Sequence, residues 1–262
     1  MKHIVLLVDL TGVAHLALEH TAIIARRSIC RVTLLHIASD GMQSQEKEIK
    51  NTVREFASTL ENDGILFAVQ INYGNFFEVI APAINAMSCD LLIVGTHGIK
   101  GFKHNFMSSN IIKLMNLLSV PALIVQGHST TPQEGYNRIL VPIIGAIPKE
   151  NIEKPLAQFA SLFHSTLHFL AYCNTHNVDD VHETINQLQH TFTLLGFPSV
   201  VQIEEIGVYA GNHSRSIVQY SDIEDIDVIL LFLHEKDNMK NFNDEDKENI
   251  LLNRFGKAVL CL

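Results

Sequence analysis

Short apolar runs alternate with longer segments of helical periodicity along the first half of the chain. The apolar runs are His3–Val8, Val32–Ile37, Ile65–Ile71, Leu91–Val94 and Ala122–Val125. Between the second and third runs, Ile49, Val53 and Phe56 recur at the spacing of one helical face. Continuous apolar runs are typical of strands that are covered on both faces. The pattern therefore predicts an α/β fold, with a five-stranded parallel sheet, right-handed crossovers and helices on both faces.

Glycine, proline and asparagine mark where the predicted helices should begin and end. Gly64 follows the long helix that contains Leu60 and is expected to cap its C-terminus. Asn75 is a predicted N-cap for a helix that runs to Met87. Because proline lacks a backbone N–H, Pro82 should kink or interrupt that helix.

The second half of the chain repeats the pattern of the first half. Arg138–Ile144 matches His3–Asp9, and Asp227–Leu233 matches Asp90–Thr96, at a spacing of about 136 residues. The polar segment between the halves, GHSTTPQEGYN, is rich in turn-forming residues. The repeat predicts two tandem domains, with the first at residues 1–127, a linker at 128–137 and the second at 138–262.

Composition excludes several classes of protein. The 262 residues are 47% hydrophobic and 18% charged, which is ample for packed cores. A net charge of −9 disfavours binding to nucleic acid or to an anionic membrane surface. No apolar run approaches the roughly 20 residues of a membrane span. The first residues, MKHIVLLVDL, are interpreted as a strand rather than a signal peptide.

Cysteine and histidine give no sign of a metal site. The chain has four cysteines, which are widely scattered, and fourteen histidines that form no recognisable metal-ligand spacing. Scattered cysteines are typical of apolar core positions in a reducing compartment. We therefore expect no metal site and a cytoplasmic protein.

The loop after the fourth predicted strand carries the most distinctive chemistry. No Asp or Glu lies between Asp90 and Glu134, although the chain holds 28 acids. Gly95 and Gly98 break the strand pattern, and the sequence Ser108-Ser109-Asn110 is a helix N-cap signal. An acid-free glycine loop that leads into a helix N-terminus is a natural anion site, since free backbone N–H groups and the helix dipole favour negative charge.

These residues resemble the signature of the universal stress protein family. Gly95-Thr96-His97-Gly98, nine residues and then Ser108-Ser109 is similar to the family pattern G-x2-G-x9-G-[ST], with Ser108 in place of the third glycine. The resemblance covers essentially the whole chain as a tandem member. It implies a fold like that of the adenine nucleotide alpha hydrolases. It also implies ATP or AMP as the ligand, with Mg²⁺ as a possible bound ion.

The resemblance also implies which residues bind the nucleotide. The aspartate after the first strand accepts from adenine in the family, and Asp9 has that position; the glycine loop holds the phosphates. The expected contacts are Asp9, Leu10, Ala38, Gly95, Gly98, Ser108, Ser109 and Asn110. Simpler roles stay open: Asp9 as a cap of the helix near Gly12, the glycines as turn residues, and Ser108–Asn110 as an N-cap. No catalytic residue is assigned.

The second half lacks these features. Ile144 stands opposite Asp9, while Phe232 and Glu235 stand opposite Gly95 and Gly98. The following segment is rich in acids, which would repel phosphate. We expect this domain to bind no nucleotide. The resemblance implies that it pairs with the first domain through the fifth strands, at Leu123–Val125 and Val259–Cys261; a further homodimer is left open.

Three functions are compatible with the sequence. The first is a stress-response regulator that binds an adenine nucleotide in its N-terminal domain. The second is a scaffold protein in which both nucleotide sites are vestigial, as Ser108 suggests. The third is a slow ATPase or nucleotidyl-transfer enzyme, for which the chain shows no G-x4-G-K-[ST] loop and no H-x-G-H signature.

Overall fold

The computed structural model describes residues 1–96, 108–144, 149–205, 213–233 and 242–262. The chain divides into two compact units, Met1–Gln133 and Glu134–Leu262, here named the first and second domains. The predicted linker contributes to both. Thr131 donates its hydroxyl to Glu19 of the first domain at 2.5 Å, and Tyr136 is buried against Phe159 and Phe163 of the second. The boundaries at residues 127 and 138 stay a prediction.

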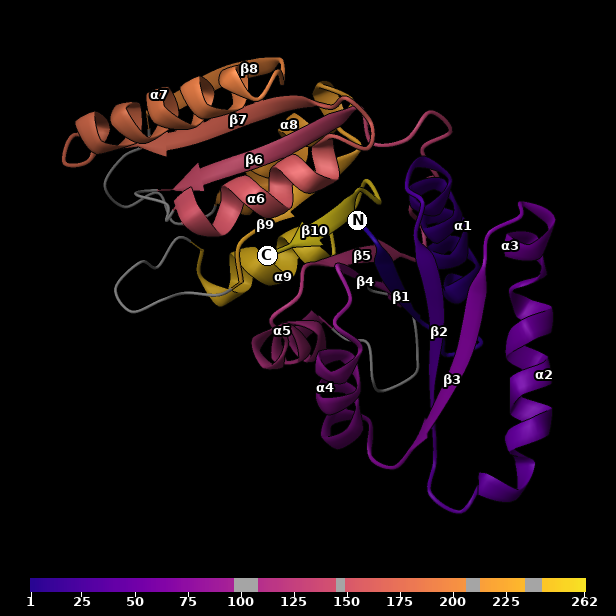
Figure 1. Ribbon diagram of the computed structural model, residues 1–262. Coiled ribbons are helices and arrows are strands. Elements are labelled where there is room, and N and C mark those ends of the chain that lie inside the picture. Colours follow the sequence, from indigo (N-terminus) through magenta and orange to yellow (C-terminus); the bar gives the residue numbers. More distant parts are fainter. Residues whose placement is uncertain (97–107, 145–148, 206–212, 234–241) are drawn as a thin grey trace. The chain divides into compact units, whose positions relative to one another are not determined.

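The first domain is built from five parallel strands with helices between them (Figure 1). Its elements are β1 (His3–Leu7), α1 (Gly12–Arg27), β2 (Arg31–Ala38), η1 (Gln43–Gln45), α2 (Glu46–Phe56), α3 (Ser58–Asn62), β3 (Phe67–Tyr73), α4 (Phe76–Met87), β4 (Leu91–Thr96), α5 (Ser108–Leu117) and β5 (Ala122–Gln126). The strand order is β3-β2-β1-β4-β5, and each described pair is parallel. The predicted fold class is confirmed for this domain.

The strand order decides which face of the sheet each helix covers. The chain runs outward from β1 through β2 to β3, then returns to β4 and continues to β5. Because such crossovers are right-handed, α1 and α2 cover one face, and α4 and α5 cover the other. The direction reverses between β1 and β4, and open parallel sheets bind ligands at the carboxyl end of that point.

The second domain repeats this architecture. Its elements are β6 (Arg138–Ile144), α6 (Lys149–Ala160), β7 (Thr166–Cys173), α7 (Val178–Leu194), β8 (Ser199–Glu205), α8 (His213–Ile223), β9 (Val228–Leu231), α9 (Asp244–Leu251) and β10 (Ala258–Cys261). The strand order β8-β7-β6-β9-β10 is that of the first domain, element for element. The fold therefore supports the internal duplication that the sequence predicts.

One carboxylate in each domain holds the beginning of the central strand. Asp90 precedes β4, and its Oδ2 accepts from the backbone N–H groups of Lys2 and His3 at 2.5 and 2.9 Å. Asp227 precedes β9, and its Oδ2 accepts from the N–H of Arg138 at 2.9 Å. The starts of β1 and β6 each carry a backbone N–H group that needs an acceptor. The repeated aspartate supplies it at the edge opposite the candidate site.

Two local predictions need correction. Pro82 lies inside α4, which runs from Phe76 to Met87, so the expected interruption is wrong, while a kink at Pro82 stays a prediction. Proline in the second turn of a helix leaves only one ladder bond unmade, so the packing of Ile80, Ala81, Ala83 and Ile84 in the core outweighs the loss. The long second helix is instead divided at Ala57 into α2 and α3. Asn75 caps α4 as predicted, since its Oδ1 accepts from Phe77 N–H at 3.1 Å.

None of the helices among the described residues is both long and apolar enough to span a bilayer.

A buried histidine should make the stability of the first domain depend on pH. His20 on α1 is 1% exposed, and burial lowers its pKa from 6.5 to about 4. Between pH 4 and pH 6.5, His20 is therefore protonated in the unfolded chain and neutral in the folded chain. The neutral imidazole of His20 contributes stability that is fully present above pH 6.5 and is lost as the pH falls toward 4. Between pH 8 and pH 5 we expect a loss of about 2 kcal/mol from this group.

Urea unfolding of the wild-type chain and of His20→Gln at both pH values measures this effect. The difference in unfolding free energy between the two proteins should change by that amount. His15→Gln removes an imidazole from the exposed side of the same helix and is the matched control. An equal pH dependence in the wild type and in His20→Gln contradicts the prediction.

Candidate functional site

The carboxyl edge of the first sheet brings together residues that lie far apart in sequence. β1 pairs with β2 on one side and with β4 on the other, with Leu7 opposite both Leu35 and Val94. Asp9 and Leu10 follow β1, Ala38 ends β2, and Gly95 is the next-to-last residue of β4. These four predicted site residues therefore share one edge of one sheet, at the point where the chain reverses direction.

Asp9 holds the turn between β1 and α1. Its Oδ1 accepts from the backbone N–H of Thr11 at 3.0 Å and from the Thr11 hydroxyl at 2.6 Å. Thr11 is the N-cap of α1 and makes no capping bond with its own side chain. Asp9 thus stabilises the helix start, as the simpler interpretation expected. Within the described residues its bonds all involve Oδ1, which leaves Oδ2 able to accept from a ligand.

The backbone of this turn is strained at Leu10. Its φ is +59°, a left-handed conformation that costs a non-glycine residue about 1–2 kcal/mol. The side chain is 38% exposed at the sheet edge. Strain of this kind persists only where the surrounding contacts impose it. The Asp9–Thr11 bonds on one side of Leu10 and the β1–β2 ladder on the other supply those contacts.

His36 belongs to the same edge, although sequence analysis did not select it. Its Nδ1 donates to the backbone oxygen of Val8 at 2.8 Å. Since a carbonyl oxygen only accepts, this bond places the proton on Nδ1. The imidazole therefore anchors the residue that precedes Asp9. Its position two residues before Ala38, on the same side of β2, was the available signal.

Gly95 serves close packing rather than a turn. It lies inside β4, one residue beyond the predicted end of that strand at Val94, and pairs with Val125 of β5. A Cβ at this position would lie 3.1 Å from the backbone oxygen of Val13 and 3.2 Å from its Cγ1. Val13 is in the first turn of α1. Glycine therefore lets α1 approach the backbone of β4, and the turn interpretation of Gly95 is wrong.

Thr96 is a second residue that sequence analysis did not select. It ends β4, is buried, and its Oγ1 has no hydrogen-bond partner in the part of the chain that the structure describes. By strand alternation it faces away from Gly95, toward the side that α4 and α5 cover. A buried hydroxyl without a partner costs about 1–3 kcal/mol. It is the last described residue before the glycine loop.

The glycine loop itself, with Gly98, lies outside the described residues. The helix that follows begins at Ser108, so Ser108, Ser109 and Asn110 form the first turn of α5; their side chains are also outside the description. This turn contains no acid. Its backbone N–H groups have no helical acceptor and carry the positive end of the helix dipole. The electrostatics expected for an anion site are therefore present at α5.

The corresponding edge of the second domain has the opposite character. Phe232 and Leu233 are buried directly after β9, where the first domain has Gly95 and Thr96. The first turn of α9 contains Asp244, Glu245 and Asp246. Glu235 lies outside the described residues. The described part of this edge thus combines large buried side chains with negatively charged ones.

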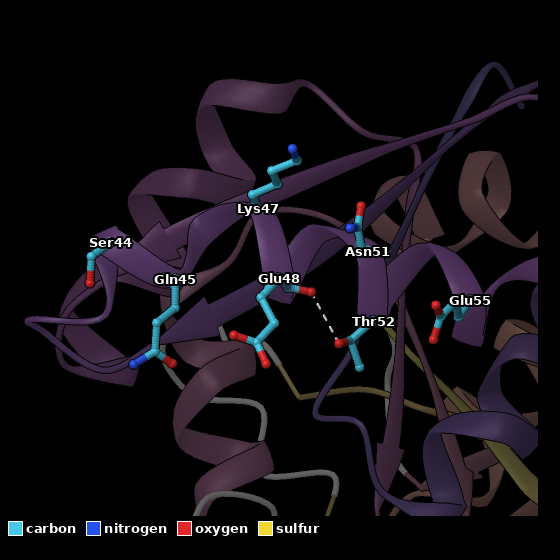
Figure 2. A pocket seen from close by; sticks show the side chains of 7 residues that line it. All are labelled: Ser44, Gln45, Lys47, Glu48, Asn51, Thr52 and Glu55. Carbon is cyan, nitrogen blue, oxygen red and sulfur yellow. Dashed lines mark hydrogen bonds between the residues drawn. The ribbon is translucent and has the colours of Figure 1, made fainter.

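A hollow of about 500 Å³ elsewhere on the first domain is not a competing site. Figure 2 shows its lining, which comes entirely from η1 and α2 and includes Lys47, Glu48 and Glu55. The hydrogen bond drawn there, from the Thr52 hydroxyl to the Glu48 backbone oxygen at 3.1 Å, is internal to the helix. A groove walled by one exposed helix of mixed charge offers no converging groups to a ligand.

Comparison with known proteins identifies the family. The model of the universal stress protein family matches residues 1–126. The N-terminal domain belongs to the universal stress protein family. A universal stress protein A homolog from Pasteurella multocida is 29% identical over 137 residues, covering 47% of this chain and 95% of its own length.

Solved structures extend the likeness to both domains. A universal stress protein from Archaeoglobus fulgidus has a TM-score of 0.75 at 15% identity, covering 99% of this chain and 97% of its own. A protein of unknown function from Pseudomonas aeruginosa has a TM-score of 0.67 at 18% identity, covering 100% of this chain and 92% of its own. At these identities the likeness shows the fold. The chain thus consists of two tandem domains with the universal stress protein fold, and the family model matches the first of them.

The packing role of Gly95 can be tested by adding a single methyl group. Gly95→Ala places a Cβ against the backbone oxygen of Val13, which cannot rotate away, so we expect the free energy of unfolding to fall by about 1–3 kcal/mol. Gly12→Ala is the matched control, because a Cβ there meets nothing within 4 Å. Chemical denaturation of both variants measures the difference. Equal stability of the two variants contradicts this role.

Proposed function

We propose that the first domain binds an adenine nucleotide, ATP or AMP, at the carboxyl edge of β1, β2 and β4. One observation carries the proposal: the acid-free first turn of α5 is the next described segment after β4, the strand that pairs with β1 at the edge where Asp9 keeps one carboxylate oxygen available. The helix start suits phosphate, and the carboxylate suits a base that donates hydrogen bonds. Membership of the universal stress protein family supports this assignment.

Each residue of the predicted site has a role in the proposed complex. Asp9 Oδ2 accepts from adenine, and His36 holds the turn through Val8. The exposed side chain of Leu10 and the end of β2 at Ala38 flank the base. Gly98 and the Ser108–Asn110 turn contact the phosphates, together with any Mg²⁺ that they carry. The second domain binds no nucleotide because Phe232 and the acids of α9 occupy the equivalent edge.

The biological role that follows is regulation rather than turnover. We propose a cytoplasmic stress-response protein whose nucleotide occupancy alters its binding to partners. Its two domains would pair through their fifth strands, β5 and β10, which each stand last in the strand order of their own domain. No group among the described residues of the edge forms a nucleophile–base pair, so no catalytic role is assigned. The alternative is a scaffold with a vestigial site, which Ser108 favours.

Titration with Mg-ATP and AMP tests the proposal. Calorimetry should give one site per chain, and millimolar nucleotide should stabilise a micromolar site by about 4 kcal/mol. Gly98→Val should weaken binding at least tenfold, because a branched side chain obstructs the approach of phosphate to the loop backbone. Glu235→Val changes the equivalent position of the second domain and should leave affinity unchanged.

The alternative outcome is equally clear. A wild-type chain that shows neither heat of binding nor stabilisation at millimolar ATP or AMP is the scaffold protein. Two sites per chain would instead contradict the assignment of the second domain.

A further inference from the structure

The second domain contains a polar cluster on the face of its sheet that α8 and α9 cover. Tyr172 near the end of β7 and Glu204 on β8 are direct neighbours in the strand register. Ser216 of α8 donates its hydroxyl to Glu204 Oε2 at 3.1 Å. The Tyr172 ring lies 4.9 Å from the half-exposed ring of His213, at 43°. Two strands and the start of α8 thus converge at the carboxyl end of this sheet.

Asp246 completes the cluster from α9. Its side chain is 2% exposed, and its Oδ1 accepts from the backbone N–H of Ser214 at 3.0 Å. The hydroxyl of Ser214 in turn accepts from Asn249 Nδ2 at 3.3 Å. Asp246 therefore caps the N-terminus of α8 from a neighbouring helix and is held in place by it.

Among the described residues, two buried polar atoms of this cluster have no hydrogen-bond partner. They are Oδ2 of Asp246 and the hydroxyl of Tyr172, which is 1% exposed. The Ser216 hydroxyl lies near that of Tyr172 and donates its own proton to Glu204 Oε2. Burial raises the pKa of Tyr172, the Ser216 contact opposes this, and the carboxylates of Glu204 and Asp246 raise the pKa further. A buried polar atom without a hydrogen bond is destabilising, so a group from outside the chain that made these bonds would be stabilising here.

The chemistry of the missing group follows from these atoms. A carboxylate oxygen only accepts, so the group must donate. A charged donor is favoured, because a buried carboxylate needs neutralisation and Asp246 forms no ion pair in the described part of the chain. The aromatic rings of Tyr172 and His213 also favour a cation. Metal ions fit less well, since the described residues offer no cluster of three metal-ligating side chains.

We propose that Asp246, Tyr172 and His213 form a binding site for the primary ammonium group of a small amine. The ammonium N–H groups bond to Asp246 Oδ2 and to the Tyr172 hydroxyl. The half-exposed ring of His213 lies on the solvent side and contacts the carbon next to the ammonium nitrogen. This site is independent of the nucleotide site proposed for the first domain.

Thermal unfolding in two salts of equal ionic strength tests the site. Methylammonium chloride offers N–H donors, whereas tetramethylammonium chloride carries the same charge without any. At 200 mM salt and pH 8, methylammonium should raise the wild-type Tm by several degrees above the value in tetramethylammonium. Asp246→Asn should abolish this difference. Asp244→Asn removes an exposed acid from the same turn of α9 and should keep it.

Tyr172→Phe provides a second measurement that does not alter the helix cap. It should reduce the methylammonium effect while leaving the tetramethylammonium Tm within a few degrees of the wild type. Equal wild-type Tm values in the two salts overturn the proposal. It is also overturned if the difference persists in Asp246→Asn, or if a crystal grown in methylammonium shows an adventitious water only at Asp246 Oδ2.

Discussion

The close approach of α1 to β4 determines the shape of the candidate site. Val13, in the first turn of α1, lies so near the backbone of Gly95 that a methyl group would have to displace it. This contact sets how the chain must turn between β1 and α1. The short turn is closed by the Asp9–Thr11 bonds and requires the left-handed backbone of Leu10. Packing on one face of the sheet therefore decides where Asp9 presents its carboxylate.

The same fold supports two different electrostatic environments. In both domains a helix follows the fourth strand, at the edge where parallel sheets bind ligands. The first turn of α5 has no acid, whereas that of α9 has three. Backbone N–H groups give both helices a positive start, and side chains decide whether that charge remains available. The fold alone thus cannot assign a ligand; the side chains at the helix start do so.

The arrangement of strands could be predicted from the sequence because each apolar run is short and bounded by turn residues. Duplication also followed from the matched positions of Asp90 and Asp227, and the structure gives both the same role at a strand start. The N-cap role of Asn75 could also be predicted from the sequence, because a side-chain cap is a local interaction. Local chemistry and periodicity together carried these predictions.

Tertiary contacts explain what the sequence could not predict. Pro82 continues α4 because the core contacts of its neighbours outweigh one lost hydrogen bond. Gly95 looks like a turn residue in sequence, and only its distance to Val13 reveals the packing role. His36 and Thr96 have no motif, yet the first anchors Val8 and the second leaves a buried hydroxyl without a partner beside the loop. Such roles depend on neighbours that are distant in the chain.

Loss of the anion site and formation of the cationic site in the second domain can be one structural change. At the spacing that relates Asp90 to Asp227, Asp246 corresponds to Ser109 of the first domain. Its carboxylate lies in the first turn of α9, the counterpart of α5, and also accepts from the backbone N–H of Ser214 at the start of α8. One oxygen satisfies that helix start, and the other stays buried without a donor. A carboxylate that replaces a hydroxyl at this position therefore disfavours phosphate at the start of α9 and, in the site that we propose, favours a cation.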